Sequence, residues 1–328
     1  MTEKFDVFVD GRSGTTGLQI TQRLTRHPHV RLMEIPEGER KDRETRRKYL
    51  NEASVVFLCL PDQAAGEAVS LFAQSNRATK VIDASTARRV HPDWVYGLPE
   101  LSGAQREAIA LSARIANPGC HATAFLLPIG PLVKAGLIPA DYPVACHSIT
   151  GYTGGGKPMI DEYESGDRKG RYPDYDAPRE YALGQNHKHI PEMFRYSGLD
   201  FAPAFSPVVA DFPRGLAVFT PLAARLLKGY GRGDDVPRRL WEALAEHYQG
   251  SPMVRVMPYE GGDLCDGKSY LNAMACNDTD RAELFVLGGG EQITLACRLD
   301  NLGKGAGGAA IQNMNLMMGL PEDTGLIR

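Results

Sequence analysis

FDVFVDGRSGTTGLQITQRLTRHP, residues 5–28, has the pattern of a strand, a glycine turn and a helix. Apolar residues alternate from Phe5 to Val9, three glycines follow at three-residue steps, and Leu18 to His27 can form a helix that ends before Pro28. Glycines at such a turn let the backbone approach a pyrophosphate, and the amides at the helix start attract its charge. The residues expected to bind a dinucleotide here are Gly11, Ser13, Gly14, Thr15, Thr16 and Gly17. A tight turn without a ligand is the alternative, because the spacing is GxxGxxG rather than GxGxxG.

The residues that follow continue the alternation of strands and helices. Strands are expected at 30–35, 54–62 and 80–86, and a helix at 63–74. Apolar strands separated by helices predict a parallel, doubly wound α/β sheet of the Rossmann type. Pro61 and Ser85 come at the strand ends where such sheets bind ligands, so we expect both beside the cofactor. Ordinary turn and cap chemistry would also favour these residue types.

The charges after the second expected strand bear on the choice of cofactor. An acidic residue about 20 positions after the glycines suits a ribose 2′-hydroxyl, whereas a basic residue suits a 2′-phosphate. Glu34 lies within the expected strand, and Arg40, Lys41 and Arg43 lie just past it. The basic residues favour NADP, and the alternative is a solvated helix face.

Length and composition limit the class of protein. At 328 residues the chain exceeds one ordinary core, so we expect two domains, and 43% hydrophobic with 23% charged residues is typical of globular proteins. The net charge of −3 gives no general attraction to nucleic acid or anionic membranes. No apolar run approaches the roughly 20 residues that span a bilayer, and MTEKFDVFVDGRSG lacks the pattern of a secretory signal. These features predict a cytoplasmic enzyme without a nucleic-acid or membrane partner.

The six cysteines differ in their surroundings. None belongs to a CxxC pair, which disfavours a zinc cluster, and a reducing cytosol disfavours disulfides. Cys59 and Cys297 lie in apolar, strand-like runs that indicate core positions. Cys120, in NPGCHATAF (117–125), follows a sharp turn and begins a helical pattern. The positive end of that helix would favour the thiolate, and neighbouring amides could hold an oxyanion, so Cys120 is predicted to be a nucleophile.

Two further motifs carry polar chemistry. NHKHIPEM (186–193) places His187 and His189 two residues apart, which could ligate a metal if the segment is extended. No partner stands at zinc-like spacing, so we predict no metal. SITGYTGGGKP (148–158) either presents Lys157 to an anionic substrate or is a plain loop, and Arg179 is a second basic candidate.

Four segments together resemble the N-acetyl-γ-glutamyl-phosphate reductase family in its short, type 2 form, within the aspartate-semialdehyde dehydrogenase-like superfamily. They are NPGCHATAF (117–125), GLPEL (97–101), NHKHIPEM (186–193) and DNLGKGAGGAAIQNMNLMMGLPE (300–322). The resemblance implies a Rossmann domain, 1–117 with 301–328, and an inserted α/β catalytic and oligomerisation domain, 118–300, of the aspartate-semialdehyde/glyceraldehyde-phosphate dehydrogenase type. The apolar stripe of 310–318 suits a helix that packs on the first sheet.

The resemblance also implies an activity and roles for residues. It implies NADPH-dependent reductive dephosphorylation of N-acetyl-γ-glutamyl phosphate to N-acetyl-glutamate 5-semialdehyde, in arginine biosynthesis, through a thioester on Cys120. His189 would transfer the proton, His187 would contact the substrate, and Asn301 would lie near the nicotinamide. Since the substrate carries a phosphate and a carboxylate, at least two cations are expected. The substrate-binding residues expected are therefore Asn117, His187, Lys157 and Arg179, in a homodimer or homotetramer.

Three other functions stay open at this point. A related reductase of aspartyl or carrier-bound aminoadipyl phosphate would share the fold and the chemistry. A cysteine hydrolase would leave the glycine turn unexplained, and a non-catalytic NADP-sensing module would leave Cys120 and the histidines unexplained.

Overall fold

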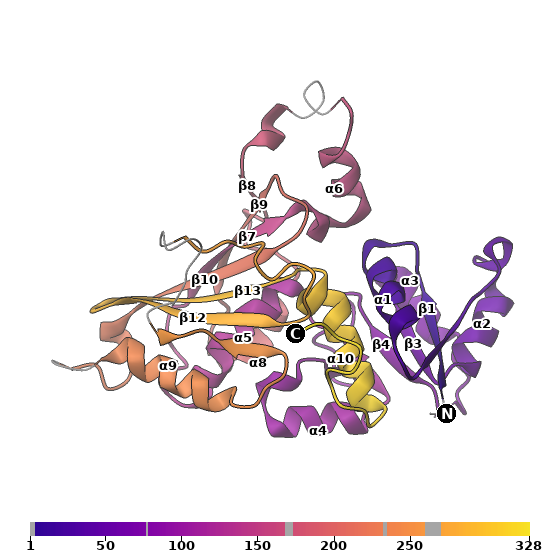
Figure 1. Ribbon diagram of the computed structural model, residues 1–328, viewed down its shortest axis with the longest axis horizontal. Helices are drawn as coiled ribbons and strands as arrows, with labels where there is room; N and C mark the ends of the chain where they lie inside the picture. The colour runs from indigo at the N-terminus through magenta and orange to yellow at the C-terminus, as the bar shows by residue number, and fades with distance from the viewer. Residues whose placement is uncertain (1–3, 77, 168–172, 232–234, 260–269) are drawn as a thin grey trace. The chain divides into compact units, whose positions relative to one another are not determined.

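The computed structural model describes residues 4–76, 78–167, 173–231, 235–259 and 270–328. The chain forms two compact units (Figure 1). Unit 1 comprises Met1–Pro118 and Ala306–Ile327, and unit 2 comprises Gly119–Gly305 with Arg328. Among the described residues, every helix is too short or too polar to span a bilayer.

Unit 1 is built on a parallel sheet of six strands in the order β2-β1-β3-β4-β6-β5. The strands are β1 (Phe5–Asp10), β2 (Val30–Met33), β3 (Val55–Leu58), β4 (Lys80–Asp83), β5 (Val95–Tyr96) and β6 (Arg114–Ala116). The helices are α1 (Thr15–Arg26), α2 (Arg43–Glu52), α3 (Asp62–Ser70), α4 (Gly103–Leu111) and α10 (Gly308–Met317), with short 3₁₀ turns at Glu37–Glu39 and Pro99–Leu101.

The alternation of side chains along β1 builds a core on each face of this sheet. Val7 and Val9 pack in one cluster with residues of α1, α4 and α10, whereas Phe8 packs in a second cluster with residues of α2 and α3. Helices therefore cover both faces, and the doubly wound sheet that the sequence predicted is confirmed. Three strands were predicted longer than they are: the expected strands at 30–35, 54–62 and 80–86 correspond to β2, β3 and β4, which end at Met33, Leu58 and Asp83. β2 ends at Met33, where its pairing with β1 stops, so Glu34 lies beyond the strand.

Unit 2 is built on a mixed sheet of seven strands in the order β11-β12-β13-β10-β7-β9-β8. The strands are β7 (Ala145–Gly151), β8 (Arg179–Glu180), β9 (Ala204–Ala210), β10 (Leu216–Ala223), β11 (Val254–Val256), β12 (Ala282–Gly289) and β13 (Gln292–Leu299). The helices are α5 (Cys120–Lys134), α6 (Gly156–Tyr163), α8 (Ile190–Ser197) and α9 (Val236–His247), with 3₁₀ turns at Tyr152–Gly155, Pro173–Asp176 and Ala224–Leu226 and a π-helical segment at Gly303–Gly307.

Helix α5 is the central helix of unit 2. It packs against α8, α9 and the strands β10 and β13 on one face of the sheet, as Figure 1 shows. Almost every side chain from His121 to Leu132 is buried, because the helix is apolar all round. Such a helix has a fixed position, and its first residue, Cys120, is fixed with it.

Candidate active site

The site begins where a turn leads into α5. Gly119 is the N-cap of the helix in an extended conformation, and its amide donates a hydrogen bond of 3.0 Å to Glu192 Oε2. That amide is therefore engaged within the protein. An oxyanion beside Cys120 would use the amides of the first turn of α5, which have no partner within the helix.

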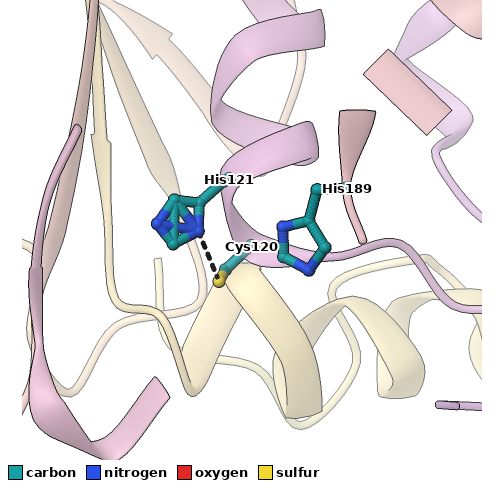
Figure 2. Close-up of side chains that lie close together, drawn as sticks. All are labelled: Cys120, His121 and His189. Carbon is teal, nitrogen blue, oxygen red and sulfur yellow. Dashed lines mark hydrogen bonds between the residues drawn. The ribbon is translucent and has the colours of Figure 1, made fainter. Parts of the chain in front are cut away.

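Two imidazoles approach the thiol of Cys120 (Figure 2). His121 Nδ1 lies 3.5 Å from Cys120 Sγ, and Sγ, a nitrogen of His121 and a nitrogen of His189 all lie within 4.8 Å of one another. The thiol is partly exposed, while His121 and His189 are buried. The arrangement places a reachable nucleophile between two groups that can carry a proton.

A buried carboxyl group connects His189 to the start of α5. His189 is the N-cap of α8 and Glu192 lies in the first turn of that helix, so the two side chains share one face. His189 Nε2 and Glu192 Oε1 are 3.9 Å apart, and the second carboxyl oxygen accepts from Gly119. Glu192 thus orients both the histidine and the helix that carries the cysteine.

An aromatic wall surrounds the two imidazoles. His187 Nδ1 accepts from the backbone amide of His189 at 3.1 Å, and the rings of these two histidines meet edge to face at 4.6 Å. Phe205 packs edge-on against His121 and His187. Tyr181 Oη lies 3.5 Å from His121 Nε2, and burial, followed by the charge of Cys120, raises the pKa of Tyr181 well above its usual value. Tyr181 therefore keeps its proton at neutral pH.

No role was predicted from the sequence for His121, Tyr181 or Glu192. The i,i+3 spacing of His189 and Glu192 at a helix start was a usable signal for the third of these. His121 had only its place beside Cys120, which a core residue of α5 would share. Tyr181 had no local signal at all.

Of the other described cysteines, Cys146, Cys276 and Cys297 are buried, and Cys59 is partly buried. Burial raises the pKa of Cys146 and of Cys276 to about 12, and it also raises the pKa of Cys59 and of Cys297 well above the usual value of a thiol. Their thiols stay protonated and unreactive at neutral pH. Cys265 lies outside the described residues.

Lys157 and Arg179, the two basic residues expected at the substrate, contact other side chains. Lys157 lies on α6 with its side chain 74% exposed and pairs with Asp161 at 2.8 Å. Arg179 lies over the ring of Tyr175, 3.4 Å from its centroid, and donates to Tyr163 Oη at 2.9 Å. Within the described part of the chain, neither forms a hydrogen bond or ion pair with Cys120 or the two imidazoles.

Two predicted asparagines are buried and hydrogen-bonded. In unit 1, Asn117 Nδ2 donates to Ala306 O at 3.0 Å and its Oδ1 accepts from Asn313 at 3.3 Å. In unit 2, Asn301 accepts from the Gly215 amide at 2.8 Å and donates to Thr153 Oγ1 at 3.1 Å. Each side chain holds distant segments of its own unit together.

The predicted cofactor residues of unit 1 gather at one edge of its sheet. Gly11 has φ +88°, and a Cβ there would lie 2.3 Å from Cys59 O, so only glycine allows the turn to approach the end of β3 this closely. Pro61 is the N-cap of α3 and lies in the short turn that follows β3, and Ser85 lies in the turn that follows β4. Because β1, β3 and β4 are adjacent and parallel, these positions share the edge at which such sheets bind ligands.

The charged groups nearest to this edge are paired. Arg12, in the glycine turn, lies 3.1 Å from Glu34, and Arg46 of α2 lies 2.7 Å from Asp10. Arg40, one of the basic residues singled out in the sequence, instead pairs with Glu37. The arginine that meets the acidic residue after β2 is therefore Arg12.

Comparison with known proteins agrees with this architecture. Residues 6–111 match the family model described as semialdehyde dehydrogenase, NAD binding domain, and residues 120–301 match semialdehyde dehydrogenase, dimerisation domain. Aspartate semialdehyde dehydrogenase from Francisella tularensis superposes with a TM-score of 0.68 at 14% identity, covering 96% of this chain and all of that one. The Candida albicans enzyme with NADP gives a TM-score of 0.65 at 15% identity and covers 96% and 99% of the two chains. These likenesses show a shared fold.

Closer relatives define the group within this class. The N-acetyl-gamma-glutamyl-phosphate reductase 2 of Nostoc sp. is 43% identical over 324 residues, 98% of each chain. The N-acetyl-gamma-glutamyl-phosphate reductase of Brucella ovis is 45% identical over 317 residues, 95% of this chain and 98% of that one. The fold and the matched domains define an NAD-binding enzyme of the semialdehyde dehydrogenase class. Within that class the chain belongs to the N-acetyl-γ-glutamyl-phosphate reductase family. The family predicted from the motifs is confirmed.

Proposed function

We propose that this chain reduces N-acetyl-γ-glutamyl phosphate to N-acetyl-glutamate 5-semialdehyde and inorganic phosphate with NADPH, in arginine biosynthesis. The observation that carries the proposal is the Cys120 thiol at the start of α5, with nitrogens of His121 and His189 within 4.8 Å. The family membership gives the substrate class, and the position of the thiol supports a thioester route.

The residues of unit 2 support a thioester mechanism. The Cys120 thiolate attacks the acyl carbon, a C–S bond forms, and the C–O bond to phosphate breaks to release inorganic phosphate. The first-turn amides of α5 stabilise the oxygen that carries the charge during this step. His189 gives a proton to the oxygen of the reduced adduct and takes it back as that adduct collapses to the aldehyde and the thiolate.

The glycine turn of unit 1 fits a dinucleotide. Gly14 is the N-cap of α1 and forms no side-chain cap, so the first amides of the helix can donate to a pyrophosphate. Gly11, Ser13, Gly14, Thr15, Thr16 and Gly17 would hold the phosphates, with Pro61 and Ser85 at the same edge. A bound NADPH would supply the hydride that reduces the thioester. The acidic residue after the second strand of such a domain lies beside the ribose 2′-position, and here that residue is Glu34. The guanidinium of Arg12 contacts Glu34, so we place Arg12 at the 2′-phosphate.

The remaining predicted residues keep proposed roles. We assign His187, Asn117, Lys157 and Arg179 to the substrate and Asn301 to the nicotinamide end. The predicted cofactor domain (1–117 with 301–328) corresponds to unit 1 and the predicted catalytic domain (118–300) to unit 2, and the main difference is that residues 301–305 pack with unit 2. The matched dimerisation domain supports a homodimer or a homotetramer.

One assay separates this function from its rivals. Purified protein is given NADP⁺, phosphate and N-acetyl-glutamate 5-semialdehyde, and formation of NADPH is followed by absorbance. Aspartate semialdehyde is the parallel substrate. Phosphate-dependent reduction of NADP⁺ with the acetylated substrate alone supports the proposal. Turnover with aspartate semialdehyde alone would assign the sister activity, and no reduction with either would favour a hydrolase or a sensor.

A further inference from the structure

The thiol and the two imidazoles form a set of donors suited to a metal ion as well as to catalysis. Zinc binds cysteine sulfur at about 2.3 Å and histidine nitrogen at about 2.0–2.1 Å in a tetrahedron, which separates the sulfur from each nitrogen by about 3.6 Å. Cys120 Sγ and His121 Nδ1 are already 3.5 Å apart. The nitrogen of His189 lies within 4.8 Å of both, so a small rotation of its ring would complete three ligands.

The surrounding groups orient both histidines toward the thiol. His121 Nε2 approaches Tyr181 Oη, and His189 Nε2 approaches Glu192 Oε1. The Nδ1 atom of His121 thereby faces Cys120, and the ring of His189 lies on the other side of the thiol in Figure 2, with one nitrogen within 4.8 Å of it. A hydroxyl or carboxyl group on the far nitrogen of a ligating histidine is the usual outer shell of zinc sites.

The local charge also permits a cation. The positive end of α5 opposes one, but the thiolate offsets that effect and the carboxyl group of Glu192 lies behind His189. Thiolate and imidazole together select zinc over magnesium or calcium, which prefer oxygen ligands.

We propose that Cys120, His121 and His189 form an inhibitory Zn²⁺ site, with water or chloride as the fourth ligand. Zinc bound there occupies the sulfur that acts as nucleophile, so the metal blocks the thiol reversibly. His187 stays outside the site, because its Nδ1 accepts from the backbone amide of His189. The proposal rests on the donor geometry and is independent of which acyl phosphate the enzyme reduces.

The test measures binding of the metal alone. Untagged protein, freed of metal by a chelator, is titrated with Zn²⁺ in competition with a chromophoric chelator, and Co²⁺ serves as a spectroscopic probe. We expect one Zn²⁺ per chain and a cobalt complex with a thiolate charge-transfer band and tetrahedral visible bands. Losing an outer-shell group typically costs 10–100-fold in affinity, so Cys120→Ser and His121→Asn, which each remove a ligand, should weaken binding by at least about 100-fold. His187→Asn, the matched control, should bind as the wild type does.

A second measurement uses only the wild-type protein, so its result does not depend on whether the variants fold. In the wild-type protein, Zn²⁺ should slow alkylation of Cys120 by iodoacetamide, located by peptide mass, and a chelator should restore the rate. Tight stoichiometric binding that survives Cys120→Ser, a cobalt spectrum without thiolate character, or alkylation unaffected by saturating Zn²⁺ would each overturn the proposal. These experiments contain no substrate, so their failure is distinct from failure of the proposed reductase activity.

Discussion

In the proposed mechanism one sulfur atom, that of Cys120, carries the chemistry. Cys120 lies at a helix start, whereas burial raises the pKa of Cys59, Cys146, Cys276 and Cys297. Substitutions of single cysteines can therefore distinguish a nucleophilic thiol from a thiol that only packs in the core.

We expect Cys120→Ser to fold and bind cofactor while losing nearly all turnover, because a serine hydroxyl is scarcely ionised at neutral pH. Steady-state rates and circular dichroism measure the two properties. Cys297→Ala is the control: it should retain kcat and lower the melting temperature, since it opens a cavity in the core. Turnover of Cys120→Ser within about tenfold of wild type would contradict a thioester route.

The two histidines of the HKHIPE segment should separate kinetically. His189→Asn should slow kcat by roughly 10²- to 10⁴-fold, the range for loss of a general acid/base, because its ring faces the thiol. His187→Asn should raise KM more than it lowers kcat, because we assign His187 to binding of the substrate rather than to proton transfer. The reverse result would exchange the two roles, and no effect of either would make the segment structural.

At the scale of elements, the π-helical segment Gly303–Gly307, which precedes α10, packs closely against the first residue of α5. A Cβ added at Gly305 would lie 2.7 Å from Cys120 Cβ and 3.1 Å from Asp300 O. A displacement of about 1 Å in a catalytic group can cost roughly 100-fold.

Gly305→Ala should therefore lower kcat by tenfold to 100-fold, an estimate from the cost of misplacing a catalytic group, with a normal far-ultraviolet circular dichroism spectrum. Gly289→Ala is the matched control in the same unit, because a Cβ there meets no atom within 4 Å. Wild-type kcat in Gly305→Ala would show that this packing does not position the thiol.

The turn between β1 and α1 should set the choice of cofactor. We expect faster reduction with NADPH than with NADH, and Arg12→Ala should lower kcat/KM for NADPH by about tenfold or more, the cost of a charge-assisted hydrogen bond. Arg40→Ala is the comparison, because Arg40 pairs with Glu37 on the short turn after β2. If Arg40→Ala has the larger effect, the 2′-phosphate binds at the basic run instead.

Features contained in one short segment could be predicted from the sequence. Contacts between side chains that strand pairing brings together could not. The glycine turn and the cysteine before a helix are each contained in one short segment, so the fold class and the family could be predicted. Tyr181 reaches His121 only because the segment after β8 pairs with β9, where its amide donates to Pro207 O. Arg179 was expected at the substrate from its charge, but no local pattern reveals that Tyr163 and Tyr175 surround it.

Across the whole molecule, one buried histidine links stability to pH. His27 Nε2 lies 3.0 Å from Asn315 Oδ1, which joins the end of α1 to α10, and burial lowers the pKa of His27. The unfolded chain binds a proton near pH 6.5 that the folded chain binds only at lower pH. The stability supplied by neutral His27 is therefore complete above about pH 6.5 and is lost as the pH falls toward the folded value.

Melting temperatures between pH 7.5 and 5 test this linkage. Wild-type protein should lose stability on acidification, by up to about 1.4 kcal/mol per pH unit for one proton. His27→Gln should be less stable at pH 7.5 and should lose less on acidification. Burial also lowers the pKa of His147 in unit 2, so some dependence on pH should persist in the variant. An unchanged slope in His27→Gln would rule out His27 as the linked group.

Unit 1 consists of two segments of the chain separated by unit 2, so its core forms from residues that are translated at different times. Ala310, Ile311 and Met314 complete a core that begins with Val7 and Val9, yet the whole of Gly119–Gly305 is translated between them. At about 5–20 residues per second, a ribosome takes roughly 10–40 s to cross that interval. The nascent sheet waits through it with one apolar face lacking α10, while unit 2 can already collapse. Unit 1 should therefore complete its core only after α10 has been translated.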